Sequence, residues 1–146
     1  MKRRIAAGIV IAACGLAVVG FTRGSLAHES QSETAAKEPP PGLKLETLLS
    51  AALDGVDGTE VIVSRVTIPP HTSLPKHWHP GEEFAYVVEG SATLWQDGKE
   101  DIVGHAGDVL MVPLKQVHTA ITADEGAMII VFRVHEQDKP ERVLID

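Results

Sequence analysis

Cysteine is nearly absent from this chain of 146 residues, in which Cys14 is the only one. Without further thiolates, the chain cannot form an iron–sulfur cluster or a Cys-rich structural zinc site. Residues 15–146 cannot form an internal disulfide either. We therefore expect the folded domain to be stabilised by its core and by any metal that it binds.

Clusters of basic residues are also absent beyond the N-terminus. Lys and Arg number 13 against 20 Asp and Glu, and four of the 13 lie within residues 1–27, so residues 28–146 carry 9 against 20, a net charge of −11. Nucleic acids and anionic lipids bind clustered Lys and Arg. The charge pattern therefore predicts no nucleic-acid partner, and an acidic surface of this kind helps to concentrate cations.

The first 27 residues are typical of a secretory signal peptide. Met1–Arg4 is positively charged, Ile5–Val19 is apolar, and Ser25-Leu26-Ala27 supplies small residues before a cleavage point. Cleavage after Ala27 would deliver the protein to the periplasm or outside the cell.

Two alternatives remain for this leader. Ile11-Ala12-Ala13-Cys14 loosely fits a lipidation motif, and the apolar run that ends near Phe21 could stay uncleaved as an anchor. In either case the N-terminus would be the only attachment to a membrane.

Residues 28–42 are predicted to form a flexible linker, and residues 43–146 a single domain. The linker is rich in Glu, Ser, Thr, Ala and Pro and has too little apolar surface to fold. The domain begins with Leu43–Leu53, whose leucines fit both an amphipathic helix and an edge strand.

From there on the chain reads as short strands and turns. The predicted strands are rich in β-branched or apolar residues and are separated by Pro and Gly pairs: 61–68, 83–88, 91–96, 102–103, 109–112, 117–122 and 127–134. Seven or more strands at this spacing indicate an all-β sandwich or barrel.

The most informative residues are His77, His79, Glu83 and His118. In a strand, residues i and i+2 point to the same face, so His77 and His79 point the same way. Pro80-Gly81 breaks the strand, which allows Glu83 to return towards the two imidazoles. His118 can join them only if the sheet curls or a second sheet packs over the first.

Imidazole and carboxylate ligands suit a divalent Fe, Mn, Zn, Ni or Cu ion. Four protein ligands on a six-coordinate metal would leave two positions open for water, dioxygen or a bidentate substrate. The pattern therefore indicates a reactive or ligand-binding metal site more than a closed structural one.

The spacing around these ligands resembles the two motifs of the cupin superfamily. The first motif is Gly-x5-His-x-His-x3 or x4-Glu-x6-Gly. His77, His79, Glu83 and Gly90 match it, and His71 stands in place of the opening Gly. The second, Gly-x5-Pro-x-Gly-x2-His-x3-Asn, is matched by Gly107, Pro113 and His118. Lys115 and Thr122 stand where that motif has Gly and Asn.

The resemblance implies a double-stranded β-helix, or jelly-roll barrel, with a short N-terminal segment. It also implies a metal held by His77, His79, Glu83 and His118, and a protein that is often a homodimer. Similar cupins include dioxygenases, isomerases, decarboxylases and oxalate-degrading enzymes, and the fold does not decide among them.

Two functions therefore stay open. The first is a metal-dependent enzyme, either a dioxygenase-like oxidoreductase or an isomerase, that acts on a small oxygen-rich molecule. The second is a non-catalytic module of the cell envelope that binds a metal or a small ligand. Catalytic residues beyond the metal ligands are not identified by the sequence.

Other side chains have simpler interpretations. Arg65 and Arg133 are expected to point outward, although an inward guanidinium could bind a substrate carboxylate. His105 and His135 are expected to be exposed, and His71 to lie in a surface turn. Five large side chains are expected in the core rather than on the cavity wall: Phe84, Tyr86, Trp95, Met111 and Phe132.

Overall fold

The computed structural model describes residues 39–145 of the chain. The predicted signal peptide, residues 1–27, and most of the predicted linker, 28–42, lie outside these residues. The described part is all-β, with no helix in it and hence no helical segment long and apolar enough to cross a membrane. Its nine strands are β1 (Lys44–Ala52), β2 (Thr59–Ile68), β3 (His77–Trp78), β4 (Gly81–Gln96), β5 (Ile102–His105), β6 (Val109–Val112), β7 (His118–Ile121), β8 (Ala127–Glu136) and β9 (Val143–Leu144).

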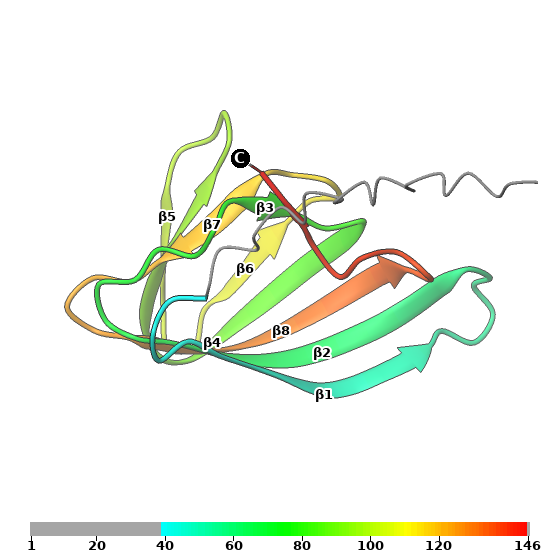
Figure 1. The fold of residues 1–146 in the computed structure, drawn as a ribbon, viewed down its shortest axis with the longest axis horizontal. Coiled ribbons are helices and arrows are strands. Elements are labelled where there is room, and N and C mark those ends of the chain that lie inside the picture. The colour runs from blue at the N-terminus through cyan, green and yellow to red at the C-terminus, as the bar shows by residue number, and fades with distance from the viewer. Residues whose placement is uncertain (1–38, 146) are drawn as a thin grey trace, which may run out of the picture. The chain divides into compact units, whose positions relative to one another are not determined.

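The strands form one curled antiparallel sheet in the order β1-β2-β8-β4-β7-β3-β9, with β5 and β6 also paired to β4. In Figure 1, β1, β2 and β8 run side by side with the first part of β4, and β3, β5 and β7 lie opposite them. This curling brings strands from distant parts of the chain to face one another across the interior, as a jelly roll requires.

Strand β4 connects the two layers. Its first half pairs with β8 and β6, and its second half pairs with β5 and β7. The sequence predicts two strands here, separated at Gly90. The structure has one bent strand instead, with a register shift between Val87 and Glu89 and a positive φ of 71° at Gly90. A side chain at Gly90 would also collide with the backbone of Gly126, so both conformation and space call for glycine.

The sequence of Leu43–Leu53 is compatible with both an amphipathic helix and an edge strand, and the structure has a strand here. β1 lies at one edge of the sheet, pairs only with β2 among the described strands, and is exposed along its whole length.

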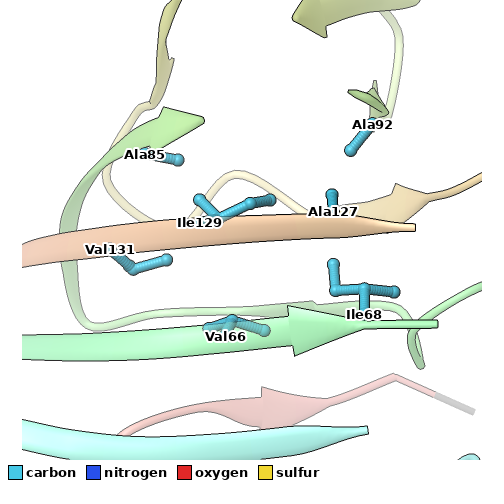
Figure 2. Close-up of a cluster of buried hydrophobic side chains, with 7 residues drawn as sticks. All are labelled: Val66, Ile68, Ala85, Ala92, Ala127, Ile129 and Val131. Carbon is cyan, nitrogen blue, oxygen red and sulfur yellow. The ribbon is translucent and has the colours of Figure 1, made fainter. Parts of the chain in front are cut away.

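The core lies on the concave side of the curled sheet. Alternate residues of β2, β4 and β8 point inward and are buried, as expected of strands with one solvated face. Figure 2 shows the resulting cluster of aliphatic side chains: Val66, Ile68, Ala85, Ala92, Ala127, Ile129 and Val131.

The same alternation corrects the expectation that large side chains fill the core. Tyr86, Met111 and Phe132 are 47%, 51% and 42% exposed, and they lie on the convex side. Phe84 and Trp95 are half-buried. The physical reason is periodicity: residues 84 and 86 must face away from Glu83 and Ala85, which point inward.

Candidate metal site

The structure brings His77, His79 and His118 together at one end of the interior. His77 lies on β3 directly opposite His118 on β7, and His79 follows β3 by one residue. All three are buried, and their ligand atoms lie within 4.8 Å of one another. The three imidazoles thus converge as predicted. His77 and His79 point the same way because they are two residues apart, and the curling of the sheet brings His118 to them.

Each imidazole is oriented by a backbone carbonyl. The Nδ1 atoms lie 2.7, 2.5 and 2.9 Å from the carbonyl oxygens of Pro75, Glu141 and Gln116 for His77, His79 and His118 respectively. Because a carbonyl oxygen only accepts, each Nδ1 carries the proton and donates it. The Nε2 lone pairs are then free, which is the tautomer that histidine ligands of metals adopt.

The donor atoms around Glu83 form a suitable site for a cation. The Nε2 atoms of His79 and His118 are buried and have no hydrogen-bond partner. Glu83 Oε2 lies 3.0 Å from Nε2 of His79, and Oε1 lies 3.8 Å from Nε2 of His118. A carboxylate that faces imidazole lone pairs without an intervening proton is repulsive, whereas a divalent cation among these donors would satisfy all of them. The residues present therefore fit a metal.

Glu83 also pairs with Arg133, and this corrects one expectation. The Arg133 guanidinium points inward and is buried, with Nε 2.9 Å from Glu83 Oε2 and Nη1 bonded to Glu141. Arg133 lies on the same side of β8 as Val131 and Ile129, so the alternation places it inside. Arg65 is partly exposed and pairs with Glu46 at 3.5 Å, as expected of a solvated side chain.

The environment keeps these groups in the charge states that metal binding needs. Burial lowers the pKa of His77 to about 4 and also lowers the pKa of His118, so both imidazoles are neutral near pH 7. In the absence of a metal, burial alone would raise the pKa of Glu83, but the hydrogen bond that His79 donates when its Nε2 carries a proton, together with the charge of Arg133, outweighs burial and lowers that pKa to about 2. Glu83 is therefore a carboxylate.

The other histidines among residues 39–145 differ in part from expectation. His71 and His105 are exposed, as predicted, and lie near Asp124 and Asp108. His135 is 1% exposed rather than solvated, with Nε2 3.3 Å from the carbonyl oxygen of Pro140 and Nδ1 3.5 Å from Glu60. It lies two residues beyond Arg133 on the inward side of β8, which explains its burial.

The segment after β8 is a part of the site that sequence reasoning missed. β9 pairs with β3 beside His77, and Glu141 supplies both the carbonyl that orients His79 and a carboxylate that binds Arg133. No periodic signal marks a two-residue strand or a backbone carbonyl in an irregular loop, so this contribution had no sequence signature.

Two residues that depart from the cupin motifs adopt a backbone conformation that glycine favours. His71 and Lys115 have φ values of 51° and 58°, in the left-handed region that favours glycine. Thr122, in place of Asn, ties its loop to β2's end by donating to the carbonyl of Pro69 and accepting from the N–H of Thr72.

A cavity of about 300 Å³ adjoins the three histidines, Glu83 and Arg133 and extends along the aliphatic core. This volume is sufficient for a small molecule next to a bound metal.

Comparisons with known proteins agree with this architecture. Residues 64–133 match the Cupin_2 family, described as a cupin domain, whereas the comparison with curated proteins gave no match.

Among solved structures, the chain is similar to the DMSP lyase DddQ from Ruegeria pomeroyi DSS-3, with 23% identity and a TM-score of 0.59 over 70% of this chain and 51% of that one. It thus spans about half the length of that lyase. It is also similar to a cupin-like protein from Thermotoga maritima (21%, TM-score 0.57, 70% and 75%) and to an RmlC-like cupin with a double-stranded β-helix fold from Methanocaldococcus jannaschii (16%, TM-score 0.55, 71% and 86%). At these identities the likeness concerns the fold. The comparisons therefore show a match to a cupin domain over residues 64–133 and a shared double-stranded β-helix fold.

Proposed function

We propose that this protein is an exported metal-binding cupin in which His77, His79, His118 and Glu83 hold a divalent metal that binds or transforms a small oxygen-rich molecule. The ion would be Fe, Mn, Zn, Ni or Cu, because these ions accept imidazole and carboxylate ligands. The observation that carries the proposal is the orientation of the three imidazoles, each of which donates from Nδ1 to a carbonyl and turns a lone pair towards the others.

Glu83 is proposed as the fourth ligand. Its carboxylate is buried, ionised and adjacent to the Nε2 atoms of His79 and His118. Arg133 holds Oε2 in place, in the way that outer partners orient the ligands of many metal sites.

A catalytic role is favoured by one observation at the edge of the cavity. Glu141 lines the cavity, has a side chain that is 46% exposed and accepts a hydrogen bond from Arg133, so an ionisable group lies next to the proposed metal ligands. The alternative is a non-catalytic module that captures a metal or a small ligand. Turnover of a small molecule by the loaded protein would favour the enzyme, and tight binding without turnover would favour the module.

Export is proposed from residues 1–27 alone, with cleavage after Ala27. The N-terminal sequence of the protein recovered from the periplasm should then begin at His28, whereas lipidation at Cys14 or retention of the leader would give a membrane-bound form.

A homodimer is proposed from the convex face of the sheet. Tyr86, Met111 and Phe132 are exposed there, and the strand register places Phe84 next to both Phe132 and Met111. A contiguous apolar face of this kind can pack on its own copy about a two-fold axis, which protects it from water.

Metal analysis tests the proposal most directly. Protein purified without added chelator should contain close to one divalent ion per chain, and His118→Ala and Glu83→Ala should lower that content together with the metal-dependent part of the melting temperature. His105→Ala, at an exposed histidine near Asp108, is the matched control and should change neither. Unchanged occupancy in both ligand variants would show that the four-ligand assignment is wrong.

A further inference from the structure

The lining of the cavity changes from polar to apolar along the strands. Glu83 on β4 pairs with Arg133 on β8, and two residues further along β4 Ala85 pairs with Val131. Each such step advances roughly 7 Å along a strand. The candidate metal site therefore occupies one end of the cavity, and the next layers are aliphatic.

These inner layers are built from aliphatic side chains of five strands: Val66, Leu94, Leu110, Ala120, Ile129 and Val131. Figure 2 shows Val66, Ile129 and Val131 gathered with the alanines of β4 in this region. Alanine at several inward positions leaves space where larger side chains would have filled the core, so the hydrocarbon lining encloses part of the cavity of about 300 Å³.

A single hydroxyl stands out in the first aliphatic layer. Ser64 on β2 pairs with Val131 in the strand register, lines the cavity and is 2% exposed. Its Oγ atom is buried without a hydrogen-bond partner. Because a buried hydroxyl without a partner is unfavourable, this atom is available to a polar group of a molecule in the cavity.

We infer that the ligand of this site is amphiphilic: an oxygen donor that binds the metal, a hydrocarbon body in the aliphatic layers, and a hydrogen-bonding group that meets Ser64. This inference rests on the proposed metal site and narrows its ligand. A molecule that carries hydroxyls at every carbon, such as a free sugar, would lose their hydrogen bonds against the hydrocarbon lining.

Binding of a carboxylate series tests the hydrocarbon part. The probe is protein loaded with Co²⁺, whose visible absorption reports exchange of a metal ligand, titrated with straight-chain carboxylates from acetate to octanoate. Burial of each added methylene should tighten binding about fourfold until the chain outgrows the cavity. Equal dissociation constants across the series would overturn the inference.

Crowding of the first aliphatic layer provides the matched variants. Ala120→Leu places a larger side chain in the lining, next to Leu94 in the register, and Ala51→Leu places one on the exposed edge strand β1. Ala120→Leu should keep its Co²⁺ content and its acetate affinity but lose most of the gain for longer acids, and Ala51→Leu should behave like the wild type. Full retention of the gain in Ala120→Leu would place the hydrocarbon chain outside this cavity and contradict the inference.

Ser64 is tested with two probes of equal length, hexanoate and 6-hydroxyhexanoate. Ser64→Ala should weaken binding of the hydroxy acid several-fold and leave hexanoate unchanged, while Ser50→Ala, at an exposed serine bonded to Glu60, should affect neither. An equal effect on both acids, or on neither, would overturn the assignment of Ser64 to the ligand.

These experiments distinguish a wrong metal site from a wrong ligand. If no Co²⁺ binds to His77, His79 and His118, the proposed function is wrong. If Co²⁺ binds and its spectrum responds to acetate, but longer acids gain nothing, the metal site stands and the amphiphilic ligand is wrong.

Discussion

Replacement of Arg133 by methionine should reveal how much the interior depends on charge compensation. Arg133 is 4% exposed and binds Glu83, itself 8% exposed, through Nε at 2.9 Å. In Arg133→Met the carboxylate would stay buried without its cation. Loss of one partner from a buried ion pair costs about 3–5 kcal/mol of folding free energy, a large share of the stability of a domain of this size.

Urea denaturation at pH 7.5 with a chelator present measures this difference. The control is Arg65→Met, which removes the partly exposed partner of Glu46 at 3.5 Å and should cost no more than about 1 kcal/mol. Addition of a divalent metal should then recover part of the loss in Arg133→Met, because the ion supplies positive charge beside Glu83.

A double-mutant cycle with Glu83→Gln completes the test. Once Glu83 is neutral, loss of Arg133 should be much less damaging, so the two changes should not be additive. If Arg133→Met costs no more than Arg65→Met, or if the cycle shows additivity, the reasoning about the buried pair is refuted.

Three further predictions follow from the described geometry. In the metal-free protein, burial lowers the pKa of His77 from 6.5 to about 4, so the free energy of unfolding should fall by about 2 kcal/mol between pH 7 and pH 5. The lowered pKa of His118 acts in the same direction. A free energy of unfolding that stays constant over this range in chemical denaturation would contradict the burial of neutral imidazoles. Because the pKa of Glu83 is lowered from 4.5 to about 2, the stabilisation from this carboxylate is fully present between pH 5 and pH 7 and should add little to the change over this range. His71→Gly and Lys115→Gly should each stabilise the protein by up to about 1 kcal/mol, because both positions have positive φ. Gly90→Ala should instead destabilise it by more than about 2 kcal/mol, because the added methyl group would collide with the backbone of Gly126. The melting temperatures of the three variants test both expectations. Phe132→Lys should convert the proposed homodimer to a monomer in light scattering after gel filtration, with His105→Lys as the control at another exposed position, and a wild-type monomer at micromolar concentration would rule the dimer out.

The sequence was most informative where residue type and period combine. His77 and His79 share a face because they are two residues apart, and the cupin motifs supply the long-range partner His118, which no local rule could place. The strands predicted at 109–112 and 127–134 overlap β6 and β8, because short β-branched runs between glycine-containing turns have few alternatives.

The wrong expectations concern the direction of side chains. Residue type predicts that Arg133 points outward and that Tyr86 and Phe132 point inward, and a terminal position predicts an exposed His135. Each of these side chains instead follows the alternation of its own strand. Periodicity counted from Glu83 or from Ile129 would have placed them correctly. Residue preferences are weak compared with the geometric requirement that neighbours in a strand face opposite sides.

The role of Glu141 in orienting His79 also has a consequence for biosynthesis. The four proposed ligands are all made by residue 118, but the carbonyl that fixes the imidazole of His79 is made 23 residues later, and β9 covers β3 only after that. A nascent or proteolysed chain that stops before residue 141 can therefore contain every proposed donor and still hold one of them in no defined orientation. Capture of the ion by such a chain would be weaker, so loading with metal should follow, rather than guide, the last step of folding.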